Sequence, residues 1–435
     1  MSTDKTFSLL TRFRDRLLPR RWQVRANSPR GLLTGFVAVH LVFLVFALVT
    51  SLNGGAFSDT YIYRAWAQAG FDEQNLGPEP SPWVYPVLAL LPIAVAGAAG
   101  PGPFFFLWVL MITVLNGWAV GKLTDWGRDR HAVPAAWWWL GFVFLMGWLG
   151  FARVDGLTAP LVLVALVHGA AQPVVASALL SVATWMKVWP AAVVLALVTV
   201  VRRRVQVVVA GLLVSVAAAG VAAAMGELPS LLDFLTQQGD RGMQLEATFT
   251  TPWLWLSVLG VGGSRMYMNT EINSMQVDGP GTGTMAVLMQ PLLLLAAAVV
   301  TLLIARGLRR GEQSGAVDRT ELLLAGSLTM VTAFIVFNKV GSPQFMVWLA
   351  PAVAVGLTHH RTVWRVPAAM LIVIAVATFF VYPLFYYELS HNDPLMALVL
   401  TLRNAMLVVL LWWSGRRLYR LGSPRPAAVL TGKES

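Results

Sequence analysis

The chain has 435 residues, of which 57% are hydrophobic and only 12% are charged. Soluble domains carry about 25% charged residues, so this composition excludes a soluble globular protein. The formal net charge of +11 would suggest nucleic acid in a soluble protein, but here the basic residues stand in short stretches beside apolar runs. That pattern indicates membrane orientation and contact with anionic lipid headgroups, and it argues against a nucleic-acid partner. The absence of cysteine excludes disulfides and thiolate metal sites.

Apolar runs of helical length recur along the chain and predict an all-α polytopic membrane protein. Thirteen such segments cover residues 31–52, 83–99, 103–121, 133–151, 157–170, 173–186, 188–201, 205–226, 285–305, 320–337, 343–358, 362–386 and 394–415. We therefore expect a single transmembrane domain at 31–415, between a basic cytoplasmic segment at 1–30 and a cytoplasmic tail at 416–435. The first run lacks a small-residue cleavage site, which favours an uncleaved helix over a signal peptide. Only the two tails and residues 266–282 have the composition of disordered chain.

Basic stretches between the apolar segments predict which loops are cytoplasmic. They lie at residues 12–30, 202–204, 306–319, 359–365 and 416–420, with a weaker stretch at 122–130. An odd number of crossings would put the two basic ends of the chain on opposite sides of the membrane, so thirteen crossings cannot make every basic stretch cytoplasmic. The segment 83–99 contains Pro86 and Pro92, and about twelve true spans remain if it enters from outside and returns. The alternative places residues 122–130 outside.

This topology places most of the polar interruptions on the outer side of the membrane. They are the loops 53–82 and 227–284, Arg153 with Asp155, Lys187, and Asn338 with Lys339. Polar groups concentrated on one side favour an extracytoplasmic active site built from loops.

Asp59 follows the first apolar segment and is the leading catalytic candidate. A carboxylate retained beside a membrane helix is usually functional, and it can act as a general base toward a hydroxyl group. The alternative is structural, because Ser58 and Asp59 are good N-cap residues for an amphipathic helix at 60–70.

Three separate cations on the predicted outer side, Lys187, Arg241 and Lys339, could clamp a phosphate. The alternative for each is that its side chain extends toward lipid headgroups. Arg153 and Asp155 are two residues apart and could pair with each other. Arg403 lies within the last apolar segment and could meet a lipid phosphate or an acidic partner.

The sequence predicts no metal site. His168, His359 and His360 have no carboxylate at ligand spacing, although Asp72, Glu73 and Glu79 in the first loop could bind a divalent ion. We therefore expect no cofactor, without excluding a divalent ion. A glycine-rich nucleotide loop is also absent, which disfavours a soluble nucleotide substrate.

Six segments, in this order, resemble glycosyltransferase family 87 of the GT-C class, the actinobacterial mannosyltransferases. They are residues 58–64 (SDTYIYR), 83–86 (WVYP), 152–155 (ARVD), 183–190 (ATWMKVWP), 241–246 (RGMQLE) and 337–344 (FNKVGSPQ). The resemblance implies that Asp59 is the catalytic base and that Lys187 and Arg241 bind the donor phosphate. Other polar residues of these segments complete the candidate substrate-binding set: Tyr63, Arg64, Tyr85, Arg153, Asp155, Glu246, Asn338, Lys339 and Gln344. Val87 departs from the Tyr-Pro-Pro of many members, which leaves the acceptor open.

The resemblance further implies a GT-C-type bundle of about 12 transmembrane helices in a bacterial plasma membrane, with its active site in extracytoplasmic loops. The implied donor is polyprenyl-phosphate-mannose, and the implied acceptor is a glycolipid or lipoglycan, such as a phosphatidylinositol mannoside or lipomannan. One carboxylate and a cation clamp suit this chemistry without an obligatory metal. Alternatives are transfer of another polyprenyl-phosphate sugar, such as arabinofuranose, and a lipid or polysaccharide transporter. The sequence predicts no particular oligomeric state.

Overall fold

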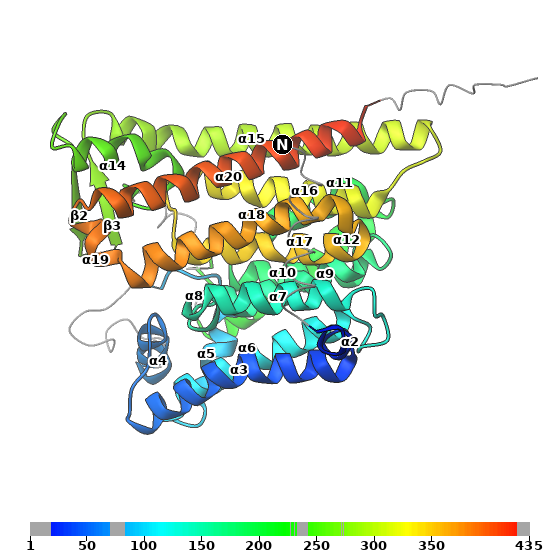
Figure 1. Cartoon of the computed structure of the whole chain (residues 1–435), viewed down its shortest axis with the longest axis horizontal. Helices are drawn as coiled ribbons and strands as arrows, with labels where there is room; N and C mark the ends of the chain where they lie inside the picture. The colour runs from blue at the N-terminus through cyan, green and yellow to red at the C-terminus, as the bar shows by residue number, and fades with distance from the viewer. Residues whose placement is uncertain are drawn as a thin grey trace, which may run out of the picture.

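The computed structural model describes residues 19–69, 83–226, 228–229, 231–232, 242–270, 272 and 274–423. Its helices are α2 Arg20–Ala26, α3 Pro29–Leu52, α4 Thr60–Ala69, η2 Val87–Ala89, α5 Leu90–Gly97, α6 Phe104–Leu123, α7 Val133–Met146, α8 Trp148–Phe151, α9 Asp155–His168, α10 Pro173–Met186, α11 Pro190–Val200, α12 Arg204–Ala224, η3 Thr248–Thr250, α14 Thr251–Val258, α15 Thr282–Gln313, α16 Arg319–Val336, η4 Pro343–Leu349, α17 Ala350–His359, α18 Arg361–Phe379, η5 Phe380–Leu384, α19 Tyr386–Ser390 and α20 Pro394–Leu421. The long helices lie along the long axis of the molecule (Figure 1). The terminal stretches 1–18 and 424–435, expected to be disordered, lie outside the described residues.

The helix ends follow local sequence signals. Proline stands in the first turn of α3, α10, α11 and α20, where its missing N–H has no helical partner to lose. Asp393 caps α20 by accepting a hydrogen bond from the Met396 N–H at 2.8 Å. Gly169 ends α9 at a φ of 44°, a conformation that a side chain would disfavour. These signals explain why most predicted segment ends lie within a few residues of the helix ends, whereas α15 and α20 continue beyond the predicted residues 305 and 415.

Seven helices among the described residues are long and apolar enough to cross a membrane. They are α3, α6, α12, α15, α16, α18 continued by η5, and α20. Five further apolar helices have 10–17 residues, shorter than the roughly 20 residues that span a bilayer core. The structure therefore supports a multi-pass helical membrane protein, while the count of about twelve spans stays a prediction.

The segment predicted to enter and return is made of short helices. α5 has 8 residues, about 12 Å of helix, so it cannot cross a bilayer by itself. It packs against α4 and α6 instead. This agrees with a segment that does not complete a crossing.

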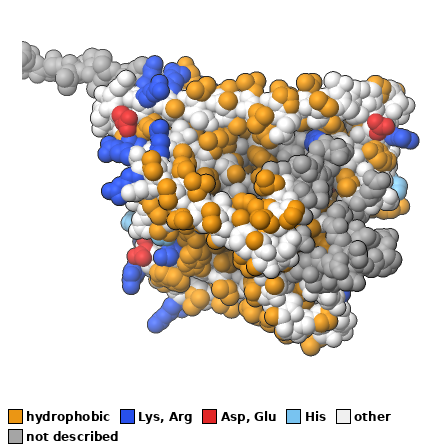
Figure 2. Space-filling view, turned by 180° about the vertical axis from the view of Figure 1, so that it is seen from behind, with side chains coloured by type: hydrophobic (Ala, Val, Ile, Leu, Met, Phe, Trp, Pro, Cys, Tyr) orange, Lys and Arg blue, Asp and Glu red, His pale blue; other side chains and the backbone are white. Residues whose placement is uncertain are grey.

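The basic loops gather at one end of the molecule. On the face of the molecule that Figure 2 shows, most of the Lys and Arg side chains lie at this end. A Cβ atom placed on Gly127 would lie 2.9 Å from the Cβ of Pro29, and Trp137 donates a hydrogen bond to the Ala26 carbonyl at 2.8 Å. The stretch 122–130 therefore lies beside the basic N-terminal segment. This contact argues against the alternative that places 122–130 on the opposite side.

A small antiparallel sheet corrects the all-α prediction. Its strands are β1 Met243–Gln244, β2 Arg265–Asn269 and β3 Ser274–Asp278, in the order β1-β3-β2. Val277 pairs with both Met243 and Met266, and Val277 is 2% exposed. The prediction that residues 266–282 are disordered is wrong for the described part of this stretch, because the sheet packs against α14 and α15. Figure 1 shows β2 and β3 at one end of the molecule, near α14 and α19.

Candidate active site

A large cavity lies at the end of the molecule that holds the sheet. Its volume is about 1490 Å³. Most of the predicted site residues line it: Asp59, Tyr63, Tyr85, Arg153, Lys187, Glu246, Asn338, Lys339 and Gln344. Segments far apart in sequence thus converge on one space, as the predicted topology requires.

Asp59 forms an ion pair with Arg153 in this cavity. Tyr63 donates a hydrogen bond of 3.5 Å to the same carboxylate oxygen, and its hydroxyl lies 3.0 Å from that of Tyr85. The side chains of Asp59 and Arg153 are 22% and 16% exposed, so the pair is largely shielded from solvent. These hydrogen bonds involve side chains rather than the N–H groups of α4, which argues against the helix-cap interpretation.

Local backbone geometry brings Asp59 to the cavity. Ser58 adopts a φ of 57°, which turns the chain sharply just before α4. The Thr60 hydroxyl stabilises this turn by accepting a hydrogen bond from the Phe57 N–H at 3.0 Å. The prediction of a helix from residue 60 is confirmed, and its preceding turn presents the carboxylate.

Asp155 pairs with Lys187, not with Arg153. The Lys187 Nζ lies 2.8 Å from Asp155 Oδ2, and Trp348 donates a hydrogen bond to the other carboxylate oxygen. Asp155 is completely buried and does not line the cavity. The possibility that Arg153 and Asp155 pair with each other is therefore wrong. Asp155 begins α9, whereas Arg153 precedes α9 and contacts Asp59, the residue before α4.

Lys187 sits at a break in the helices. It adopts an extended conformation between α10 and Pro190 at the start of α11. Its Nζ lies 5.2 Å from the Tyr85 ring centroid and 5.8 Å from that of Phe345, within reach of cation–π attraction. Because this side chain is inward and ion-paired, it does not extend toward headgroups. Burial lowers the pKa of Lys187, but its neighbours, above all the charge of Asp155 and the hydrogen bond to it, together raise the pKa above its ordinary value.

Arg153 has an unused donor. Burial opposes its charge, yet the neighbouring Asp59 carboxylate raises its pKa, so the guanidinium stays cationic. Its buried Nε has no hydrogen-bond partner among the described residues. Because Arg153 also lines the cavity, its cationic side chain is suited to an anionic ligand there.

Gln244, absent from the predicted set, holds the 338–344 loop against the cavity. Its side-chain oxygen accepts hydrogen bonds from the Gly341 N–H at 2.9 Å and the Ser342 hydroxyl at 3.3 Å. The backbone N–H of Gln244 donates to the Lys339 carbonyl at 2.9 Å. A Cβ at Gly341 would lie 2.4 Å from the Ala247 backbone, so glycine is required there. Asn338 accepts a hydrogen bond from the Val340 N–H at 2.8 Å and so shapes the same loop.

Glu246 is buried at the cavity wall. Tyr386 donates a hydrogen bond of 2.8 Å to its Oε1, whereas its Oε2 has no partner among the described residues. Burial raises the pKa of Glu246 above its ordinary value. Arg403 is also buried and donates to the Glu246 backbone carbonyl, so it meets protein groups rather than a lipid phosphate.

The remaining predicted residues are placed differently. Arg64 lies outside the cavity lining and donates a hydrogen bond of 2.8 Å to the Gly54 carbonyl. Arg241, and the acidic group Asp72, Glu73 and Glu79, lie outside the described residues. Tyr382 and Trp348, absent from the predicted set, also line the cavity.

Ligand-type side chains do come together, but at the other end of the bundle. Among the described residues, Asp318, His359 and His360 place their ligand atoms within 4.8 Å of one another. The prediction that the two histidines lack a companion carboxylate is wrong. Asp318 is 41 residues from His359 in sequence, but its Oδ2 lies 2.9 Å from His359 Nε2 in the fold. The expectation of metal-independent chemistry concerns the cavity and stays a prediction.

Comparisons with known proteins identify a family. The sequence model of glycosyltransferase family 87 matches residues 83–331, more than half of the chain. Solved structures of ArnT from Cupriavidus metallidurans, one bound to undecaprenyl phosphate and one in the apo state, are 14% and 15% identical and each reach a TM-score of 0.41. Each alignment covers 88% of this chain and 78% of that chain. Likeness at this level is too weak to define the fold or a ligand. No curated protein matches the chain.

Proposed function

Because the chain belongs to glycosyltransferase family 87, we propose that it transfers mannose from a polyprenyl-phosphate-mannose donor to a glycolipid or lipoglycan acceptor. The acceptor class is a phosphatidylinositol mannoside or lipomannan-like molecule at the outer face of the membrane. The observation that carries this proposal is the convergence of Asp59, Arg153 and Lys187 on one cavity. The basic loops gather at the end of the molecule opposite the sheet (Figure 2), so the positive-inside rule favours the cavity end as the outer side.

Asp59 is the proposed general base. It takes the proton from the acceptor hydroxyl while that oxygen forms a bond to the anomeric carbon of the donor. The bond from this carbon to the phosphate oxygen breaks, and its electron pair leaves with polyprenyl phosphate. A single displacement inverts the configuration, so a β-linked donor yields an α-mannoside.

Arg153 and Lys187 are the proposed phosphate ligands. Arg153 lines the cavity and pairs with Asp59 there. The Lys187 ammonium has three donors, and Asp155 accepts from it at 2.8 Å. Both cations therefore stabilise the negative charge that grows on the leaving phosphate. Arg241 stays a third candidate from the sequence alone.

The wall of the cavity supports a lipid-linked donor. α15 contributes Ala286, Met289 and Gln290 to the lining. The same helix exposes Val287 by 75% and Leu294 by 63%, as expected of a lipid-facing surface. A polyprenyl chain along α15 would remain in the membrane while its phosphate entered the cavity.

The test is transfer by the purified protein. Polyprenyl-phosphate-mannose and a panel of mannosylated lipids are supplied, and products are identified by mass and linkage analysis. A parallel reaction uses polyprenyl-phosphate-arabinofuranose, and a third contains a chelator, in which we expect full activity. The Asp59→Asn variant is the control for contaminating transferases. Product from arabinofuranose alone would replace the proposed sugar, and absence of any product from both donors would overturn the proposal.

A further inference from the structure

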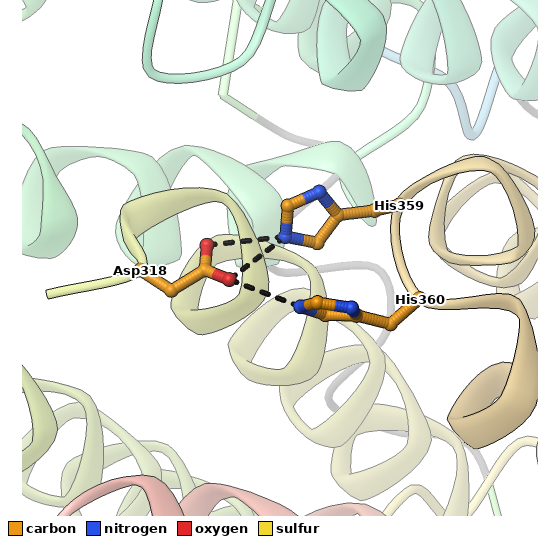
Figure 3. Close-up of side chains that lie close together, drawn as sticks. All are labelled: Asp318, His359 and His360. Carbon is orange, nitrogen blue, oxygen red and sulfur yellow. Dashed lines mark hydrogen bonds and ion pairs between the residues drawn. The ribbon is translucent and has the colours of Figure 1, made fainter. Parts of the chain in front are cut away.

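A His–Asp–His cluster joins two helical segments at the basic end of the molecule, away from the cavity. Asp318 is the N-cap residue of α16, His359 ends α17, and His360 follows at the start of the turn into α18. Figure 3 shows both imidazole rings directed at the Asp318 carboxylate. The Nε2 atom of His359 lies 3.1 and 2.9 Å from the two carboxylate oxygens, and that of His360 lies 3.2 Å from Oδ2.

These separations suit a transition-metal ion. Around a tetrahedral zinc ion with bonds of about 2.0–2.2 Å, neighbouring ligand atoms lie about 3.3–3.6 Å apart. The three ligand atoms, within 4.8 Å of one another, would reach that arrangement through small side-chain movements. Two imidazoles and one carboxylate favour zinc and similar ions over magnesium or calcium, which prefer oxygen ligands.

The backbone around the cluster holds the ligands in place. Asp318 Oδ1 accepts a hydrogen bond of 2.9 Å from the Glu321 N–H, which fixes the carboxylate at the start of α16. α16 and α17 pack against each other, so the cluster spans a formed helix contact. The Asp318, His359 and His360 side chains are 38%, 29% and 47% exposed, which leaves access for an ion and for a water ligand.

Charge acts in both directions at this site. The arginines of this end, Arg361 among them, oppose a cation, although salt screens exposed charges over about 8–10 Å. The Asp318 carboxylate and the partly negative C-terminal end of α17 attract a cation.

We propose that Asp318, His359 and His360 bind one divalent transition-metal ion of the zinc type, with water completing the coordination. The ion ties the start of α16 to the α17–α18 junction. The proposal does not rest on the transferase function, because the cluster lies away from the cavity and the proposed chemistry uses no metal.

The experiment measures binding and stability rather than transfer. The full-length protein in detergent, freed of any polyhistidine tag and of metal by a chelator, is titrated with Zn²⁺ by calorimetry and melted with and without the ion. Mg²⁺ and Ca²⁺ are run in parallel. We expect one Zn²⁺ per chain, a higher melting temperature with Zn²⁺, and no effect of Mg²⁺ or Ca²⁺.

Variants separate a metal site from simple hydrogen bonding. His359→Ala and His360→Ala should each weaken Zn²⁺ binding by more than about tenfold and abolish the melting shift. His131→Ala is the matched control, since His131 is an exposed histidine outside the cluster, and it should bind as the wild type does. If the wild type binds Zn²⁺ no more tightly than His359→Ala, the cluster is only a hydrogen-bonded contact between Asp318 and the histidines, and the proposal is wrong.

Discussion

Asp59 and Arg153 form an ion pair although 94 residues separate them in sequence. In the proposed mechanism Asp59 must take a proton from the acceptor, but its Oδ2 is already bound by Arg153 and Tyr63. A donor phosphate that engages Arg153 would compete for the guanidinium and free this oxygen for the acceptor hydroxyl. The pairing therefore couples donor binding to activation of the base.

Asp59→Asn should abolish transfer while leaving the fold intact. The amide keeps the shape of the carboxylate but cannot take the acceptor proton, so the rate should fall on the order of 10²-fold or more. Initial rates and the melting temperature are measured on the same preparation. Asp125→Asn, an exposed carboxylate at the other end, serves as the control. Near-normal turnover in the Asp59 variant would refute its role as base.

Lys187→Ala should weaken donor use more than acceptor use. One charge-assisted hydrogen bond to phosphate contributes roughly 1.5–3 kcal/mol, so efficiency toward the donor should fall about ten- to a hundred-fold. Acceptor saturation should change little. Lys187→Arg need not rescue, because the planar guanidinium does not fit where an ammonium stands between Tyr85 and Asp155. The reverse pattern, with acceptor curves shifted and donor curves unchanged, would assign Lys187 to the acceptor site.

Asp155→Asn should destabilise the protein, since it leaves Lys187 without its carboxylate. Removing one partner of a buried ion pair costs about 3–5 kcal/mol, which should appear as a lower melting temperature. Trp348→Phe removes one hydrogen bond to the same carboxylate and should cost less. The double variant Asp155→Asn with Lys187→Met removes both charges and should melt above the Asp155→Asn single variant. If it melts lower still, the two residues do not act as a pair.

Glu246 should make stability fall as pH rises. Burial raises its folded pKa above 4.5, so the folded protein holds a proton that the unfolded chain has already released. Stability is therefore greatest below the unfolded pKa and is lost as pH rises through the folded value. Glu246→Gln removes this loss, so it should melt at a higher temperature than the wild type at pH 7, and the gap should narrow toward pH 4. If the melting temperatures of the wild type and of Glu246→Gln differ by the same amount across this pH range, the folded pKa of Glu246 is not raised.

Tyr386→Phe is the companion variant for Glu246. The Tyr386 hydroxyl donates to the carboxylate and lowers the pKa of Glu246 against the effect of burial. Removing it should raise that pKa further, so the loss of stability should continue to higher pH and be larger in total. Insensitivity of the pH profile to this change would mean that the hydrogen bond does not favour the charged carboxylate.

Local signals allowed the sequence to predict the helices and the composition of the cavity. Helix ends depend on nearby residues such as Asp393 and Pro394, and loop sidedness depends on charge, so Asp59 and Lys187 could be assigned to one end without coordinates. Pairings across the fold were not predictable in this way. Arg153 has Asp155 two positions away, yet it contacts Asp59, because the start of α9 directs the two side chains to different partners.

The sheet and the histidine cluster show the same limit. β2, Arg265–Asn269, has three apolar residues in a row and so lacks the apolar alternation that predicts a strand. β3, Ser274–Asp278, does alternate polar and apolar residues, but only over five positions. Their pairing with β1 depends on contacts that a local pattern does not contain. Asp318 likewise meets His359 only because α16 and α17 pack together.

Cysteine labelling should establish which end of the molecule faces outward. The chain has no native cysteine, so background labelling by a membrane-impermeant thiol reagent should be negligible. Asn53→Cys at the cavity end and Met268→Cys in β2, where the methionine is 50% exposed, should react in intact cells. Arg128→Cys, at a side chain 81% exposed beside the basic N-terminal segment, should react only after permeabilisation. The expectation follows from the basic residues at that end, which remain on the cytoplasmic side. Labelling of Arg128→Cys in intact cells, with protection of the other two, would place the cavity in the cytoplasm and exclude an outer-face transferase.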